Sequence, residues 1–362
     1  MASRIIKIDP DGDTLVILPK KGLANGIFSH DGGGSDLGTT QPELHYLCSK
    51  KHLATASRRA CKMFASGFAE ATPDPTDNLH HWRFEPIFDP EAFEIVLKAI
   101  HAKIRDIPTF VDTQLFAGIA AIADDLECHD ALWFFAKTWL TTIKASVPTV
   151  MCSDISRFIL ISFVFDDPVI FETSTKTAIT SSSSSNQVSL LGLPIRPSIL
   201  DEIEQKRQDL LEKLINDLQN LESQLIRKKL GCSSGCSAML LGTLVQGMES
   251  CSLYFPRPSR PFPGLYLRST IASLRKLQSP KYYDSIENSP AGRYSGLWRV
   301  EQYPHGISGK PYYGASIYQN DNALKLVQHN CSLTNHVQPI LDAIETAFHG
   351  LELSKHSSFG RK

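Results

Sequence analysis

Residues 90–143 contain three successive amphipathic segments, and this stretch most constrains how the chain can fold. In the first segment, Phe93, Val96, Leu97 and Ile100 recur at helical spacing, which predicts one buried stripe. The second stripe consists of Leu115, Ile119, Ile122 and Ala123, and the third of Leu132, Phe135, Ala136, Trp139 and Leu140. Because the connections are short, we expect helical hairpins that pack against a sheet or further helices.

Shorter apolar segments precede these helices. Residues 14–18 (TLVIL) and 44–48 (LHYLC) have the composition of strands, and residues 82–88 (WRFEPIF) alternate as a strand does. Residues 53–68 show helical periodicity and are expected to form one helix. The sequence therefore predicts a helix-rich α+β fold in which a small β-sheet is flanked by helical hairpins.

The middle of the chain is less regular. Residues 155–164 mix β-branched and aromatic side chains, so they suit a helix or a strand, and we favour a helix. Residues 171–179 can continue that element. The serine run at 180–187 is typical of a linker between two parts of the chain.

The second half reads as helical. Residues 200–230 form the longest pattern, with leucines in a heptad-like seam at Leu211, Leu214, Leu218, Leu221 and Leu225. The seam suits either a dimeric coiled coil or packing against later helices of the same chain, and we favour the second. Further helices are expected at 237–249, 265–277 and 336–351, the last stopped by Gly350, with an extended segment at 256–263.

Composition excludes several functional classes. The chain has 362 residues and a formal net charge of -1, which gives no electrostatic reason to expect binding of nucleic acid or a membrane surface. No apolar run is long enough to span a bilayer, and the N-terminus lacks the pattern of a signal peptide. We therefore expect an intracellular protein, in the cytoplasm or nucleus, whose eight cysteines are reduced.

An ordered series of motifs resembles the BTB/POZ domain, in the form found in filamentous-fungal BTB-domain proteins. The series consists of residues 9–17 (DPDGDTLVI), 48–57 (CSKKHLATAS), 64–70 (FASGFAE), 89–101 (DPEAFEIVLKAIH) and 119–128 (IAAIADDLEC), and Trp139 closes it. The sequence departs from that family at Ser57-Arg58, where Ser-Pro is usual, and its N-terminal arm is short.

The resemblance implies a domain organisation and a function. A BTB/POZ domain would occupy residues 9–145 and a helical extension residues 146–180. A linker at 181–198 and a helical C-terminal region at 199–355 would follow, with a loosely ordered loop near 280–320. BTB domains associate with themselves or with other proteins, so the resemblance implies a protein–protein interaction module without catalytic activity or a cofactor. The alternative is a substrate adaptor for a cullin-type ubiquitin ligase.

Four residues of the second half are candidate metal ligands. Cys232 and Cys236 are four residues apart, a spacing that places two side chains on one face of a helix, and His329 and Cys331 form a second pair. Thiolates and imidazoles are the ligands that zinc prefers. The alternative is two ordinary buried cysteines and an exposed pair on a loop, and both interpretations remain open.

Other chemically capable residues favour structural roles. Cys61 and Cys128 lie in helical patterns and are expected to be small core residues. Asp124 and Asp125 are adjacent, so on a helix they would not face each other as an acid–base pair. His101 is expected to be solvated or to cap a helix. Three tryptophans, Trp82, Trp133 and Trp139, are expected in the core or at an interface.

Overall fold

The computed structural model describes residues 4–19, 43–183, 192–279 and 331–356. The chain divides into two compact units. The first unit comprises Met1–Gln208, Pro263–Tyr266 and Phe348–Lys362, and the second comprises Asp209–Phe262 and Leu267–Ala347. The described part is rich in helices and contains one small mixed sheet, which confirms the predicted α+β class.

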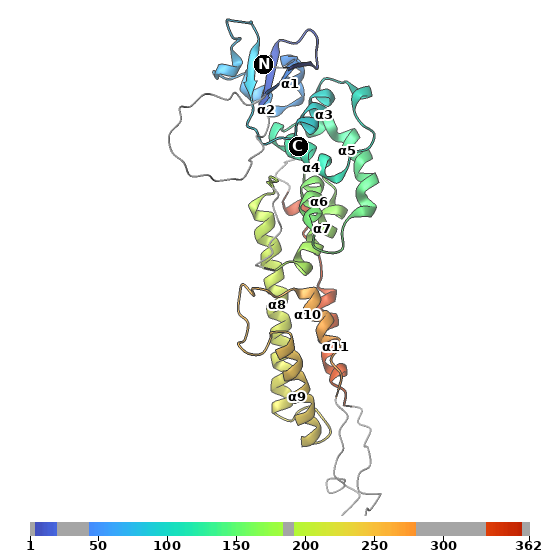
Figure 1. Ribbon diagram of the computed structural model, residues 1–362. Coiled ribbons are helices and arrows are strands. Elements are labelled where there is room, and N and C mark those ends of the chain that lie inside the picture. The colour runs from blue at the N-terminus through green and yellow to red at the C-terminus, as the bar shows by residue number, and fades with distance from the viewer. Residues whose placement is uncertain (1–3, 20–42, 184–191, 280–330, 357–362) are drawn as a thin grey trace, which may run out of the picture. The chain divides into compact units, whose positions relative to one another are not determined.

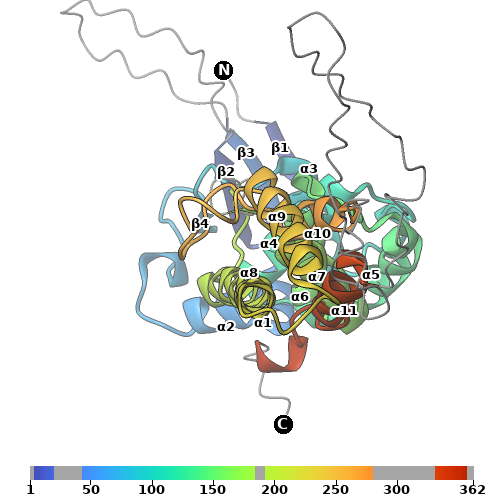
Figure 2. The same cartoon turned by 90° about the horizontal axis from the view of Figure 1, so that it is seen from below.

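The sheet belongs to the first unit and consists of β1 (Arg4–Lys7), β2 (Thr14–Pro19), β3 (Glu43–Cys48) and β4 (His80–Arg83). Its spatial order is β1-β3-β2-β4 (Figure 2). β2 is antiparallel to β3, whereas β1 is parallel to β3 and β4 is parallel to β2. In β2 every side chain from Thr14 to Leu18 is buried, so the structure covers both faces of the sheet.

The three predicted helices of residues 90–143 are confirmed as α3 (Pro90–Ile100), α4 (Thr113–Leu126) and α5 (His129–Ile143) (Figure 1). Asp89 caps α3 by accepting from the amides of its first turn, and Asp112 caps α4 in the same way. α3 packs on α4, and α4 in turn packs on α6 (Ser153–Val164).

The single helix expected at residues 53–68 is wrong, because the chain forms α1 (Lys50–Ala56) and α2 (Arg58–Phe64) instead. Ser57 separates them in extended backbone geometry. Its Oγ accepts from the Ala60 amide at 3.0 Å and donates to the Leu126 carbonyl at 2.6 Å. One buried hydroxyl therefore caps α2 and ties it to the end of α4.

The strand expected at residues 82–88 is shorter than predicted, since β4 ends at Arg83. The Phe84 amide still donates to the Ile17 carbonyl, but Pro86 has no amide hydrogen to continue a ladder. Trp82 and Phe84 point into the core as expected, with ring centroids 4.6 Å apart.

The helical interpretation of residues 155–164 is confirmed as α6 (Ser153–Val164). α7 (Pro168–Ser181) is a separate helix. Asp166 has a positive φ of 56°, which interrupts the helical path, and Asp167 then caps α7 by accepting from the Ile170 amide at 2.9 Å.

The division between the units falls at Gln208, within α8 (Pro197–Ile226), and not at the linker expected at 181–198. The first turns of α8 belong to the first unit, and Arg207 in these turns is fully buried. Its guanidinium donates to both carboxylate oxygens of Glu204, at 2.9 and 2.6 Å, and to the Leu265 carbonyl at 3.3 Å.

The second unit contains the rest of α8 with α9 (Ser234–Ser250), α10 (Leu267–Leu274) and α11 (Leu333–Thr346). All five leucines of the α8 seam are buried within the single chain, which confirms packing against the same chain. α8, α10 and α11 end earlier than predicted, and the loop expected near 280–320 lies outside the described residues. None of the helices in the described ranges is both long and apolar enough to cross a membrane.

Gly350 does not stop the last helix, because α11 ends at Thr346. Gly350 instead allows the C-terminal segment to lie close to the backbone of α7 within the first unit. A Cβ at position 350 would lie 1.9 Å from the Glu172 carbonyl oxygen of α7, and the next amide, of Leu351, donates to Thr175 Oγ1 at 2.8 Å. Only glycine lets the C-terminal segment reach this hydrogen bond.

Replacing Gly350 by alanine should lower the free energy of unfolding by about 1–3 kcal/mol, since the added methyl group overlaps backbone atoms that cannot move aside cheaply. Denaturant unfolding of the full chain measures the change. The matched control is Gly67→Ala, because nothing lies within 4 Å of the Cβ that it would add. Equal stability of the two variants would contradict the role assigned to Gly350.

Candidate interaction surface and cysteine cluster

Two adjacent aromatic residues of α5, Trp133 and Phe134, are exposed by 58% and 69%. We call them the α5 aromatic pair. They are exposed because the buried side of the helix is taken by Leu132, Ala136 and Trp139. At 100° per residue, positions 133 and 134 turn away from that side.

The helix that carries the pair is firmly anchored. The indole Nε1 of Trp139 donates to the Pro108 carbonyl at 3.1 Å, and its ring lies 5.3 Å from that of Phe116 in an edge-to-face arrangement. A rigid helix that presents large aromatic side chains loses little conformational entropy when a partner covers them.

Charged residues flank the α5 aromatic pair along the same exposed side. Asp130 lies one turn before the pair and Lys137 one turn after it, and both are exposed. The Lys137 ammonium lies 5.9 Å from the centroid of the Trp133 ring, within the range of a cation–π contact. An apolar centre with a charged rim is the usual anatomy of a protein interface.

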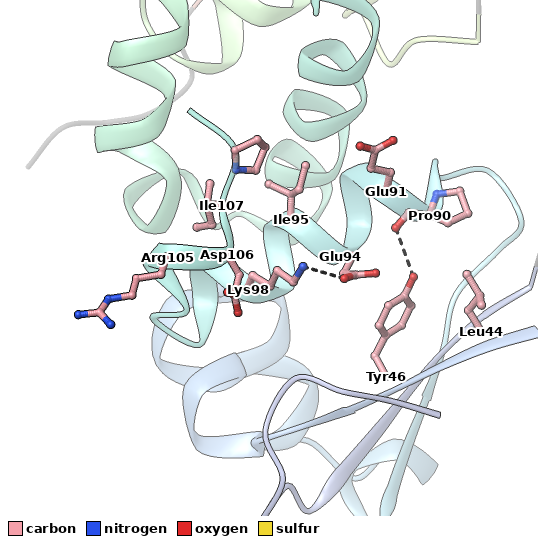
Figure 3. Close-up of a pocket in the computed structure, with 11 residues that line it drawn as sticks. Leu44, Tyr46, Pro90, Glu91, Glu94, Ile95, Lys98, Arg105, Asp106 and Ile107 are labelled. Carbon is pink, nitrogen blue, oxygen red and sulfur yellow. Dashed lines mark hydrogen bonds and ion pairs between the residues drawn. The ribbon is translucent and has the colours of Figure 1, made fainter. Parts of the chain in front are cut away.

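A groove of about 580 Å³ lies between β3, α3 and the 3₁₀ turn Ile104–Asp106 (Figure 3). Its lining includes Tyr46, Glu94, Lys98, Arg105 and Asp106. Lys98 and Glu94 form an ion pair at 2.8 Å, and the Tyr46 hydroxyl donates to the Pro90 carbonyl at 3.3 Å. Figure 3 shows the Arg105 guanidinium pointing away from the other labelled side chains.

Some of the ionisable groups that line this groove are kept neutral or held in ion pairs. Burial, reinforced by Glu94 and Asp89, raises the pKa of Tyr46, so its phenol stays neutral. Three carboxylates line the groove, those of Glu91, Glu94 and Asp106, and that of Glu94 is paired with Lys98. Among the residues that line the groove there is no serine, cysteine, threonine or histidine that could act as a nucleophile or general base.

His101 has a structural role that differs in part from the prediction. It follows the last residue of α3 as a cap, as expected, but it is buried and not solvated. Its Nε2 accepts from the Ser49 amide at 2.9 Å, and its Nδ1 lies 2.8 Å from the Leu97 carbonyl oxygen, to which it donates. This arrangement requires a neutral ring, and burial lowers the pKa of His101 accordingly.

The cysteines and carboxylates considered as catalysts are dispersed. Cys128 is buried, as predicted, and burial raises the pKa of its thiol to about 12. Cys61 is exposed, so the prediction of a core residue is wrong there. Asp125 forms an ion pair with Arg59, whereas Asp124 lies 3.8 Å from His129 Nε2. The two carboxylates therefore face different partners, as expected for neighbours on a helix.

The structure brings together three of the four predicted metal ligands. The Sγ atoms of Cys232, Cys236 and Cys331 all lie within 4.8 Å of one another in the second unit. Burial, followed by the nearness of Cys236 and Cys232, raises the pKa of Cys331. The fourth, His329, lies outside the described residues, so its role stays a prediction.

The three cysteines were predicted from the sequence, but only one of the two residues of the α5 aromatic pair was. Trp133 was expected in the core or at an interface, and Phe134 was not singled out. The helical spacing could have predicted the exposure of both residues, because neither belongs to the apolar stripe that forms the buried side of α5.

In comparisons with known proteins, no protein-family model matches this chain, and no curated protein matches it. The BTB/POZ assignment therefore remains an expectation that rests on the sequence motifs.

His101 should make stability depend on pH. Its pKa is lowered on folding, so below about pH 6.5 the unfolded chain takes up a proton that the folded chain refuses. The free energy of unfolding should fall as pH falls below that value, by less than about 1.4 kcal/mol per pH unit, the limit for one proton. Unfolding titrations between pH 8 and about pH 5 measure this contribution.

In His101→Gln this contribution to the pH dependence should disappear, while stability at neutral pH should be lower because the amide group lacks the ring geometry that joins the Leu97 carbonyl to the Ser49 amide. The control is His349→Asn, a change at an exposed histidine of the same unit, which should keep the wild-type profile. A wild-type profile in His101→Gln would show that His101 does not stay neutral on folding.

Proposed function

We propose that this chain is a protein–protein interaction module without catalytic activity. Its first unit is of the BTB/POZ type and associates with a second copy of the chain through the α5 aromatic pair. The observation that carries the proposal is the exposure of Trp133 and Phe134 side by side on a rigid helix. The order of strands and helices from β2 to α5 follows the motif series of the BTB/POZ resemblance and supports the assignment.

The α5 aromatic pair exposes a large apolar area that a partner could cover. Covering one large aromatic side chain stabilises a complex by roughly 1.5–3 kcal/mol, and aromatic residues dominate the energetics of interfaces. Two adjacent aromatic side chains from each copy would form a contiguous apolar centre.

The charges on α5 favour a second copy as the partner. Asp130 and Lys137 are seven residues apart, with the aromatic pair between them, so all four side chains lie along one side of the helix. When two such helices pair in antiparallel fashion, the Asp130 of each copy lies opposite the Lys137 of the other. A two-fold symmetric contact of this kind is self-complementary. The formal net charge of -1 adds little repulsion between copies.

Replacing both Trp133 and Phe134 by alanine should weaken self-association of the full chain at least about 30-fold, the effect of losing about 2 kcal/mol at an interface hot spot. Sedimentation equilibrium over a range of concentrations measures the dissociation constant. The control is the double variant Thr55→Ala, Thr173→Ala, which changes exposed threonines of α1 and α7 in the same unit, away from α5, whose hydroxyls bond to carbonyls of their own helices.

A charge exchange tests the antiparallel arrangement. Asp130→Lys and Lys137→Asp should each weaken the dimer, because each places like charges opposite one another, and the double exchange should restore it. Helix content and unfolding temperature of each variant separate this effect from damage to α5. A wild-type chain that stays monomeric at every concentration would contradict the proposal, as would unchanged association after loss of the aromatic pair.

A further inference from the structure

We propose that Cys232, Cys236 and Cys331 form a binding site for a thiophilic divalent cation of the zinc class, in the second unit of the chain. Their Sγ atoms lie within 4.8 Å of one another. Around a tetrahedral zinc ion with bonds of about 2.3 Å, thiolate sulfurs are separated by about 3.8 Å. Small side-chain rotations would therefore bring all three sulfurs to bonding distance.

The turn between α8 and α9 is shaped to bring two of these cysteines together. Gly231 has a φ of +94°, and a Cβ at that position would lie 2.9 Å from the Ser237 amide nitrogen and 3.4 Å from Cys236 Sγ. A side chain there would collide with the backbone and crowd the thiol. The Ser237 hydroxyl donates to the Leu225 carbonyl at 2.7 Å, which holds the start of α9 against the end of α8.

The third cysteine is positioned independently. Cys331 directly precedes Ser332, the N-cap residue of α11. Ser279 fixes this end of α11, because its Oγ accepts from the Leu333 amide at 2.5 Å and lies 3.0 Å from the Ser332 hydroxyl. The start of α11 is thus fixed by contacts that involve no cysteine, and α11 packs on α9, which carries Cys236.

Two of the three cysteines lie at the amino-terminal ends of helices. Cys236 lies in the first turn of α9, where its amide donates to the N-capping Ser233 hydroxyl at 3.1 Å. Cys331 lies just before α11. The amino-terminal ends of two helices of 17 and 14 residues therefore lie at the cluster, and their partial positive charge opposes the burial and the neighbouring thiols that raise the pKa of Cys331.

The donor set selects the class of cation. All three donors are sulfur, and no carboxylate joins them among the described residues, so a soft or borderline cation is favoured over magnesium or calcium. Three protein ligands leave the fourth position of a tetrahedral site to water or to another donor. Each sulfur that binds the ion gives up its proton to solvent.

Metal analysis of the purified full chain, kept reduced and reconstituted with zinc, should find about one tightly held ion per chain. Cys232→Ser, Cys236→Ser and Cys331→Ser should each abolish tight binding, because a serine hydroxyl is a poor ligand for zinc. The control is Cys251→Ser, since Cys251 belongs to the same unit but lies outside the cluster, and it should keep the ion. Cobalt(II) in place of zinc should give a thiolate-to-metal absorption band that the three variants lose.

A measurement on the wild-type chain keeps the proposal testable if a variant fails to fold. With zinc present, Cys232, Cys236 and Cys331 should resist alkylation, and a chelator should expose them, as mapped by mass spectrometry. The exposed Cys61 and Cys152 should react in both states. A reduced chain that holds no zinc after reconstitution would overturn the proposal. So would zinc retained by all three variants, or a disulfide within the cluster that persists under reducing conditions.

Discussion

Burial of β2 on both faces is the constraint from which the first unit follows. A sheet of four strands, none longer than six residues, cannot shield such a strand by itself, so helices must cover both sides. Aromatic contacts hold α3 on this sheet, because the Phe93 ring lies 5.8 Å from Tyr46 and 5.0 Å from Phe84. α4 then packs on α3, and α5 contacts both. The outer side of α5 remains exposed, which is where the α5 aromatic pair lies.

Polar groups inside the first unit serve mainly to connect its elements. Ser57 joins α2 to the end of α4, and His101 joins the end of α3 to the start of α1. The buried Arg207 connects elements in the same way, since its guanidinium bonds both Glu204 and the Leu265 carbonyl. Burial alone would raise the pKa of Glu204, but hydrogen bonds from Arg207 and Gln208 outweigh it and lower that pKa. These polar groups therefore hold the elements of the first unit together.

The sequence was sufficient for features that depend on local periodicity and insufficient for those that depend on contacts between distant residues. The helices of residues 90–143 were predicted because their apolar stripes repeat over several turns. The break at Ser57 was missed because apolar spacing continues across it, while its partner Leu126 is far along the chain. Gly350 was read as a helix stop because its close approach to Glu172 is visible only in the fold. The residue types pointed to Cys232, Cys236 and Cys331 as a set, but their sulfurs meet only through the fold, since Cys331 is far along the chain from the other two.

The two units are built from different elements, and the cysteine cluster lies in the one that is described as helices without a sheet. The first unit surrounds a sheet with helices on both faces, and its buried cysteines, Cys48 and Cys128, are ordinary core residues. The described residues of the second unit form helices and no strand. The α8–α9 turn and the start of α11, which carry the three cysteines, are far apart in the sequence. A cation held by Cys232, Cys236 and Cys331 would join the α8–α9 turn to the start of α11. Because such a site does not exist in the unfolded chain, the free energy of metal binding would add directly to the stability of this unit.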